Sequence, residues 1–138
     1  MQLTIDEIES VLPIVRAAVP ATPQYAWPQL REKTGIALVL KHEHHTPIGA
    51  FKVRGGLVYL DRLKRERPNT PGIISATRGN HGQSLGFAAG RHGVRAVIYV
   101  PRGNSVEKNR AMRAFGAELV EHGAVSYTHL TLPTILRV

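Results

Sequence analysis

The 138-residue sequence has no cysteine and no long apolar run. Without cysteine the chain has no disulfide, no thiolate metal ligand and no thiol nucleophile, which agrees with a cytoplasmic protein. No apolar run approaches the roughly 20 residues that a helix needs to cross a bilayer, and the N-terminus is acidic rather than basic and then apolar. We therefore expect a cytoplasmic location and no membrane partner.

Negative charge is also scarce, because 18 lysines and arginines face only 10 aspartates and glutamates, for a net charge of +8. Such a balance raises nucleic-acid binding as one class of function. The basic residues are spread along the chain, however, and the densest cluster, 62–67, includes acidic side chains, which is typical of the solvated end of a helix. Nucleic-acid binding is therefore the minority interpretation, kept open as a small basic α/β module that binds nucleotides or RNA through the segment 77–83.

The composition is that of one folded domain, since hydrophobic residues make up 43% of the chain and charged residues 20%. Thr4 and Glu7 have the spacing of a capping box, which predicts a short N-terminal helix that ends or bends at Pro13. The stretch 19–30 contains three prolines. It predicts an extended connection, with a brief helix over 29–33 and a strand over 36–41.

A regular alternation of elements begins after Gly56. Leucines at helical spacing predict a helix that ends before the turn at 68–72, and short apolar runs predict strands over 73–76, 96–100 and 118–121. Between them, helices are predicted over 82–92 and 105–116. This order implies parallel strand pairing through right-handed crossovers, with ligand sites at the carboxyl ends of the strands.

The first motif with chemical potential surrounds Lys52, which follows Gly49, Ala50 and Phe51 at the start of a predicted helix. The small residues let a planar group approach the backbone, and Phe51 is an apolar neighbour. A desolvated amine in such a place can form a Schiff base with an aldehyde. Taken alone, the same pattern also fits a surface lysine at a helix start.

The second motif, 75–84, lies between a predicted strand end and a helix start. Free backbone N–H groups at a helix N-terminus suit a carboxylate or another anion, and Gly79 and Gly82 permit close approach. Thr77 and Asn80 add side-chain hydrogen bonds. An ordinary Asn or Thr cap fits this motif about as well when it is taken alone.

Together the two motifs resemble the pyridoxal-phosphate enzymes of fold type II, the tryptophan-synthase-β-like family, and within it the threonine and serine dehydratases. The family pattern Lys-x-Glu, three residues, Pro-Thr-Gly-Ser-Phe-Lys-x-Arg-Gly is matched at Lys41, Glu43, Pro47, Gly49, Phe51, Lys52, Arg54 and Gly55. The family segment Ser-Gly-Asn-His-Gly-Gln is matched at Gly79, Asn80, His81, Gly82 and Gln83, with Arg78 where serine or alanine is usual. The likeness runs over about 22–123.

This resemblance implies an α/β protein with the fold type II architecture, in truncated form. Residues 1–54 are then the N-terminal part of a large cofactor domain, and 55–124 are an incomplete small domain, a parallel three-layer α/β unit. The implied cofactor is pyridoxal 5′-phosphate, the implied substrate is a small amino acid, and the full-length parent is expected to be a homo-oligomer.

The resemblance also implies roles for individual residues. Lys52 is the expected catalytic residue, which condenses with the cofactor aldehyde and later moves the α-proton of the substrate. The residues expected to contact the cofactor are Lys52, Phe51 and Asn80. Those expected to bind the substrate carboxylate are Thr77, Arg78, Asn80 and His81.

The implied reaction is loss of the α-proton and β-hydroxyl of threonine or serine, then hydrolysis to a 2-oxo acid and ammonia. Relatives that racemise use a serine at the position of Arg78 to reprotonate the opposite face, so Arg78 favours elimination. A hydroxyaspartate dehydratase and a serine-racemase-like enzyme remain alternatives within the family.

A metal-binding interpretation of His42, His44 and His45 is also considered. On a strand, His42 and His44 share a face, yet no further pair of ligands has convincing spacing. We therefore expect solvated histidines at a strand end and no metal site.

The segment 125–138 departs from the family pattern. Residues 125–134 match the translation of a transposon-type sequencing adapter, GTC TCT TAT ACA CAT CTG ACG CTG CCG ACG, so we expect a non-native tail rather than a genuine C-terminal strand. The phosphate-binding loop of the family and its partner for the pyridine nitrogen lie downstream of this point. We therefore expect the chain to be inactive and its apolar surface around 36–40 to be uncovered.

Overall fold

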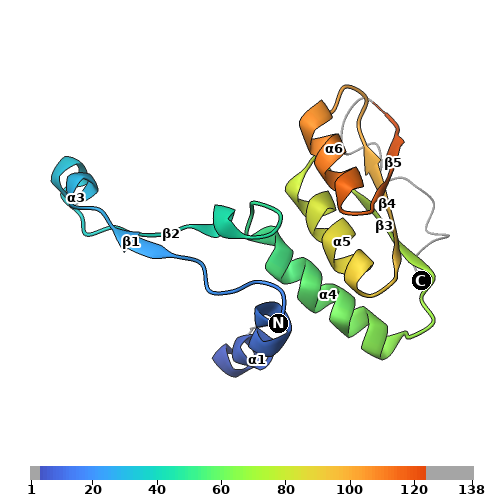
Figure 1. Ribbon diagram of the computed structural model, residues 1–138, viewed down its shortest axis with the longest axis horizontal. Coiled ribbons are helices and arrows are strands. Elements are labelled where there is room, and N and C mark those ends of the chain that lie inside the picture. Colours follow the sequence, from blue (N-terminus) through green and yellow to red (C-terminus); the bar gives the residue numbers. More distant parts are fainter. Residues whose placement is uncertain (1–3, 124–138) are drawn as a thin grey trace.

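The computed structural model describes residues 4–123. The predicted adapter-derived tail, 125–138, lies outside this range. The described residues form an N-terminal helical segment, an extended two-stranded arm and an α/β body (Figure 1).

Two short helices open the chain. Helix α1, Ile5–Ser10, begins with the predicted capping box, in which Thr4 and Glu7 each accept a hydrogen bond from the backbone N–H of the other. Helix α2, Leu12–Arg16, follows after a bend and has Pro13 in its first turn. Val15 and Val19 are buried in the same core as the body, so this segment packs against it.

The arm consists of β1, Gln24–Ala26, helix α3, Pro28–Thr34, and β2, Val39–Lys41. The two strands pair antiparallel, and helix α3 ends at Gly35, whose φ of 71° places it in the left-handed region that glycine favours. The predicted helix and the end of the predicted strand are confirmed. Strand β1 was expected to be an extended connection, and its pairing with β2 defines it as a strand.

The body begins with a 3₁₀ turn, η1, Glu43–His45, and helix α4, Lys52–Glu66. It continues as β3, Gly72–Ala76, α5, Asn80–Arg91, β4, Arg95–Val100, α6, Val106–Ala114, and β5, Glu118–Glu121. The three strands pair in parallel in the order β3-β4-β5, as the alternation of elements predicts. The loop after β3 therefore lies at a carboxyl edge of the sheet.

One face of the sheet carries the core. Ala96, Ile98 and Val100 of β4 are almost fully buried, and helices α5 and α6 pack over them. On the opposite face Ile74 is 40% exposed and Val120 is 37% exposed. The residues 4–123 thus form two of the three predicted layers. Within them, no helix is long and apolar enough to span a membrane.

Candidate active site

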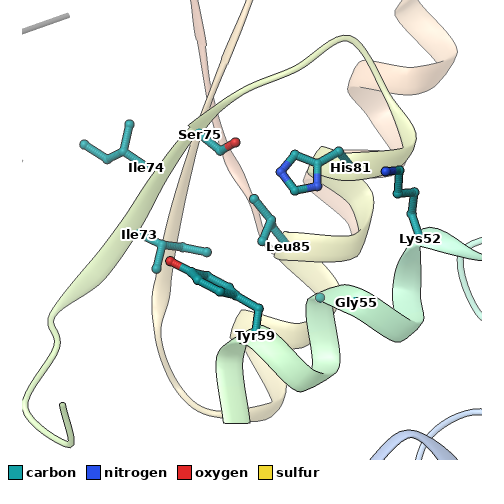
Figure 2. Close-up of a pocket in the computed structure, with 9 residues that line it drawn as sticks. Lys52, Gly55, Tyr59, Ile73, Ile74, Ser75, His81 and Leu85 are labelled. Atoms are coloured by element: carbon teal, nitrogen blue, oxygen red, sulfur yellow. The ribbon is translucent and has the colours of Figure 1, made fainter. Parts of the chain in front are cut away.

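A pocket of about 390 Å³ opens between α4, the edge strand β3 and the start of α5 (Figure 2). Its wall is made by Lys52, Gly55, Gly56, Tyr59, Ile73, Ile74, Ser75, His81 and Leu85. Ligand pockets for small molecules usually have volumes of roughly 300–1,000 Å³ and are mainly apolar with a few polar groups. This pocket has that character, with an amine, an imidazole, a phenol and a hydroxyl among aliphatic side chains.

One face of α4 supplies a wall of the pocket. Lys52, Gly55, Gly56 and Tyr59 follow the helical spacing i, i+3, i+4 and i+7, so they lie along one side of the helix. A Cβ atom on Gly55 would meet nothing within 4 Å, which shows open space beside the helix at this point. Gly55 thus leaves a gap between the lysine and the tyrosine, whereas Gly56 packs against Ser84 of α5.

Lys52 is the first residue of α4, and two neighbours define its surroundings. The Ser84 hydroxyl on α5 donates a hydrogen bond of 2.7 Å to the backbone carbonyl of Lys52 and joins the two helices at the lysine. The Lys52 Nζ lies 5.4 Å from the centroid of the Phe51 ring, within the range of a cation–π contact. The side chain itself remains exposed, so its amine is accessible.

The loop between β3 and α5 approaches the pocket from the sheet. The Thr77 backbone N–H donates to the carbonyl of Tyr99 at 3.0 Å, and the Thr77 hydroxyl accepts from the N–H of Gly79 at 3.3 Å. Gly82 lets this end of α5 approach closely, because a Cβ there would collide with Met112 and lie 2.8 Å from Thr77 Cγ2. The loop is therefore held against the sheet just before α5.

His81 and Lys52 both line the pocket, and the lysine charge acts on the imidazole (Figure 2). It is exposed at the rim of the pocket, but partial burial lowers its pKa, and the positive charge of Lys52 lowers the pKa further. Both effects disfavour the imidazolium. His81 is therefore neutral near pH 7 and can both donate and accept a hydrogen bond.

The remaining predicted residues lie on the same loop but outside the pocket wall. Asn80 is exposed and is the first residue of α5, and Thr77 is partly buried in the turn before it. The Arg78 carbonyl accepts a hydrogen bond of 3.1 Å from Asn104, and Arg78 borders a separate hollow of about 230 Å³. Of the predicted residues, only Lys52 and His81 therefore line the pocket.

The other seven residues of this wall were not predicted as site residues, and Tyr59, Ser75 and Leu85 are among them. Tyr59 had a usable signal, since it follows Lys52 by seven residues on one helix. Ser75 belongs to the predicted strand, but only the observed packing of β3 beside α4 brings it to the pocket.

A partly buried ion pair supports the segment that leads to Lys52. The guanidinium of Arg54 donates two hydrogen bonds to Glu43, of 2.8 and 2.9 Å, and the Thr22 hydroxyl donates a third, of 2.6 Å. The Arg54 hydrogen bonds lower the pKa of Glu43 to about 2, helped by Thr22 and by the charges of Arg54 and Lys41 and opposed by burial. The pair connects the start of α4 to the base of the arm.

The family model for pyridoxal-phosphate-dependent enzymes matches residues 15–132. The biosynthetic L-threonine dehydratase of Escherichia coli (strain K12) is 34% identical over 110 residues, which cover 80% of this chain and 21% of that enzyme. The chain thus spans about a fifth of the length of this relative.

Solved structures with the same fold include maize serine racemase, with a TM-score of 0.84 and 25% identity, over 94% of this chain and 40% of that one. The processed form of threonine deaminase isoform 2 from Solanum lycopersicum has a TM-score of 0.73 and 27% identity, over 90% of this chain and 37% of that one. With a family model that matches most of its length, the chain belongs to the pyridoxal-phosphate-dependent enzymes.

Proposed function

We propose that this chain is part of a threonine or serine ammonia-lyase, which converts a β-hydroxy amino acid to a 2-oxo acid and ammonia. The observation that carries the proposal is the meeting of the Lys52 amine and His81 at one pocket. An amine that condenses with an aldehyde and a loop that binds a carboxylate are the two parts that such a reaction needs. Similarity to a threonine dehydratase supports this choice of substrate class.

The described residues fit one side of pyridoxal phosphate. Lys52 offers an accessible amine at the pocket, Phe51 offers a ring beside it, and the gap at Gly55 leaves space next to the amine. Asn80 at the start of α5 is the proposed hydrogen-bond donor to the phenolic oxygen of the pyridine ring. When bound, the cofactor supplies an electron sink for the electrons of the Cα–H bond.

The protein residues bind the substrate and move the proton. The backbone N–H groups at the start of α5 and the side chains of Thr77, Arg78, Asn80 and His81 are proposed to bind the substrate carboxylate. The Lys52 Nζ then takes the α-proton. The β-hydroxyl leaves as water, and a second water hydrolyses the released enamine to the 2-oxo acid and ammonia.

Elimination is preferred to racemisation on the identity of Arg78. A racemase needs a second acid on the opposite face of Cα, and an always-protonated guanidinium is a poor proton donor at neutral pH. The similarity to maize serine racemase makes racemisation the second candidate. A hydroxyaspartate dehydratase differs only in the substrate side chain.

Borohydride trapping tests the proposal in the full-length enzyme that contains this segment. The sequence has five lysines, so the labelled position can be assigned by peptide mapping. After incubation with pyridoxal phosphate and reduction, we expect the pyridoxyl group on the Lys52 peptide. Lys52→Arg should abolish both this label and ammonia release, and Lys64→Arg should change neither. A label elsewhere, or none, overturns the proposal.

Product analysis separates the candidates. We expect L-threonine or L-serine to yield 2-oxobutyrate or pyruvate, with little of the D-isomer. Predominant D-serine formation would identify a racemase, and preference for 3-hydroxyaspartate would identify the alternative dehydratase. The nucleotide- or RNA-binding module would be favoured by two results together. The unsubstituted protein would take up no label at Lys52, and the Lys52→Ala variant would still bind RNA in a salt-dependent way.

A further inference from the structure

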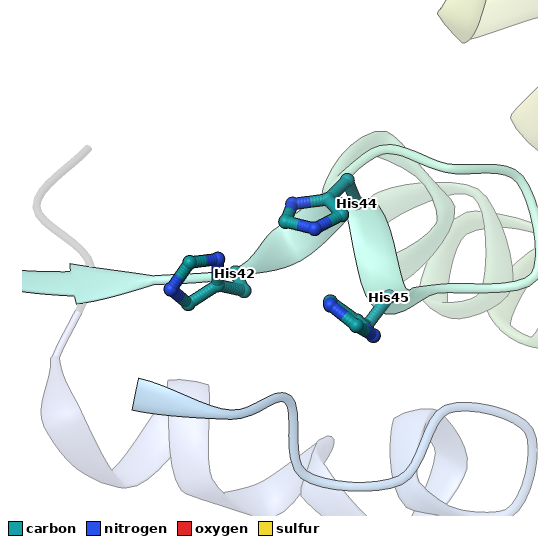
Figure 3. Close-up of side chains that lie close together, drawn as sticks. All are labelled: His42, His44 and His45. Atoms are coloured by element: carbon teal, nitrogen blue, oxygen red, sulfur yellow. The ribbon is translucent and has the colours of Figure 1, made fainter. Parts of the chain in front are cut away.

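Three of the seven histidines of the chain gather between β2 and α4, outside the pocket (Figure 3). One ring nitrogen from each of His42, His44 and His45 lies within 4.8 Å of those of the other two. The ring centroids are 5.2 Å apart for His42 and His44, and 4.3 Å apart for His44 and His45. Three imidazole ligands thus surround one small space.

The local backbone explains why all three meet. A continued strand would place His42 and His44 on one face and His45 on the other. The chain instead leaves β2 and forms the 3₁₀ turn η1, in which the His45 N–H donates to the His42 carbonyl at 3.1 Å. This turn brings His45 to the other two rings, which the strand-based sequence analysis did not anticipate.

Hydrogen bonds fix the backbone and the neighbouring side chain of the three histidines. The His42 N–H donates to the Pro23 carbonyl at 2.9 Å, which fixes the end of β2 to the chain before β1. Between the histidines, Glu43 accepts hydrogen bonds from Arg54 and Thr22, so its carboxylate is engaged elsewhere. The three imidazoles are therefore presented together by a preformed turn.

The His42 ring is held in place by its neighbours. It is partly buried and lies edge-on to the rings of Tyr25 and His44. Figure 3 shows one His42 ring nitrogen on the side of His44 and His45, and the other pointing away from them. His44 and His45 are exposed, so an ion can enter from solvent and the two side chains can rotate to close the distances around it.

We propose that His42, His44 and His45 bind one divalent transition-metal ion of the kind that imidazole prefers, such as Zn²⁺. Neutral imidazole nitrogens suit zinc, copper, nickel and cobalt, and three protein ligands leave a fourth position for water. The site uses none of the residues that line the pocket, so it is independent of the proposed lyase activity. A bound ion would link the end of β2 to the turn that leads to Lys52.

Metal titration of the chain tests this site directly. The chain is purified without a polyhistidine tag and without pyridoxal phosphate, since both bind metals, and Zn²⁺ binding is measured by isothermal titration calorimetry. We expect saturation at one ion per chain. Co²⁺ should give the intense visible absorption of a four-coordinate ion, and Zn²⁺ should raise the thermal midpoint of unfolding.

Single substitutions then assign the ligands. His44→Asn and His45→Gln replace exposed side chains and should leave folding intact by circular dichroism. Each should weaken Zn²⁺ binding by at least about tenfold, because loss of a ligand costs no less than loss of a residue that supports one. His92→Gln, which removes an imidazole at the end of α5, should leave binding unchanged. Absent saturation, or equal affinity in all three variants, overturns the proposal.

Discussion

At the scale of single residues, the carboxylate of Glu43 accepts three side-chain hydrogen bonds, from Arg54 and Thr22. Its pKa of about 2 lies below the ordinary value of 4.5, chiefly because of the Arg54 hydrogen bonds. A carboxyl with a lower pKa in the folded state stabilises the fold above its unfolded pKa, and this stability is lost as the pH falls toward the folded pKa. Glu43 should therefore make the fold acid-sensitive between about pH 4.5 and pH 2.

The substitution Glu43→Gln tests this contribution. It should lower the free energy of unfolding at pH 7 by about 1.5–3 kcal/mol, the range for hydrogen bonds to a charged group. It should also flatten the decline in stability below pH 4.5, as measured by urea unfolding at several pH values. The matched control is Glu118→Gln, which breaks a similar bidentate pair with Arg95 that is exposed. Because exposed ion pairs contribute little, Glu118→Gln should lower the free energy of unfolding less than Glu43→Gln does. An equal loss in both variants would show that partial burial does not strengthen the Glu43 pair.

A second residue-scale prediction concerns the coupling of His81 to Lys52. Because the charge of Lys52 is the lesser of two causes that lower the His81 pKa, Lys52→Met should raise that pKa while burial keeps it below 6.5. Titration of the imidazole by NMR measures the change. Lys64→Met, which removes a lysine in the last turn of α4, should leave the His81 pKa as it was. If the two variants behave alike, the amine and the loop are not neighbours.

At the scale of elements, the close approach of α4 and α5 determines where Lys52 lies. A Cβ on Gly56 would collide with the Ser84 hydroxyl and lie 2.9 Å from the Ser84 carbonyl, whereas a Cβ on Gly55 would meet nothing within 4 Å. Gly56→Ala should therefore destabilise the fold by about 1–3 kcal/mol through overpacking. Gly55→Ala should stabilise it by up to about 1 kcal/mol through helix propensity.

Thermal and urea unfolding of these two adjacent variants give a direct comparison. Both variants add one methyl group to the same helix. The sign of the change in the free energy of unfolding therefore reports whether that methyl group meets α5. Destabilisation by Gly55→Ala, or none by Gly56→Ala, would mean that the two helices do not meet at this point.

The elements of the body were predictable because each has a local signal. Apolar runs define β3, β4 and β5, and the Ser105 hydroxyl caps α6 by accepting from the Lys108 N–H, as the sequence suggests. Strand β1 has no such signal: it is a three-residue segment between Pro23 and Pro28, and only the ladder with β2 makes it a strand. Its partner β2 is equally exposed, but it ends an apolar run and was predicted from that run. Local pattern therefore predicts elements that have an apolar run or a cap, and it misses β1, which has neither.

The residues of the candidate site also fall into those that the sequence indicates and those that only the structure reveals. The family resemblance of the two motifs singled out Lys52 and the loop that includes His81, and both residues line one pocket. Ser75 lines the pocket only because an edge strand lies beside α4, and His45 joins its neighbours only because a 3₁₀ turn replaces a strand. The positions of Ser75 and His45 thus depend on how the chain folds around them, which the spacing of residues in the sequence does not reveal.

At the scale of the whole molecule, the arm leaves apolar surface in solvent, as the sequence analysis expected around 36–40. All three residues of β2 are exposed, and the arm extends away from the body (Figure 1). Tyr25 of β1 pairs with Leu40 of β2, and the Tyr25 ring contacts Trp27 at 5.9 Å between centroids. A contiguous apolar patch on a short two-stranded sheet with free edges favours association between chains.

The chain should therefore self-associate as its concentration rises, through the arm rather than the body. Leu40→Lys places a charge in the patch, where Leu40 pairs with Tyr25 and is 40% exposed, and should shift the chain toward monomer in sedimentation velocity experiments. Val106→Lys adds the same charge at a valine on α6 that is 73% exposed but stands outside the arm, and should leave association unchanged. Because both variants raise the net charge equally, a difference between them reports the patch and not general repulsion. A monomer at every concentration, or an equal effect of both substitutions, would show that the arm does not drive association.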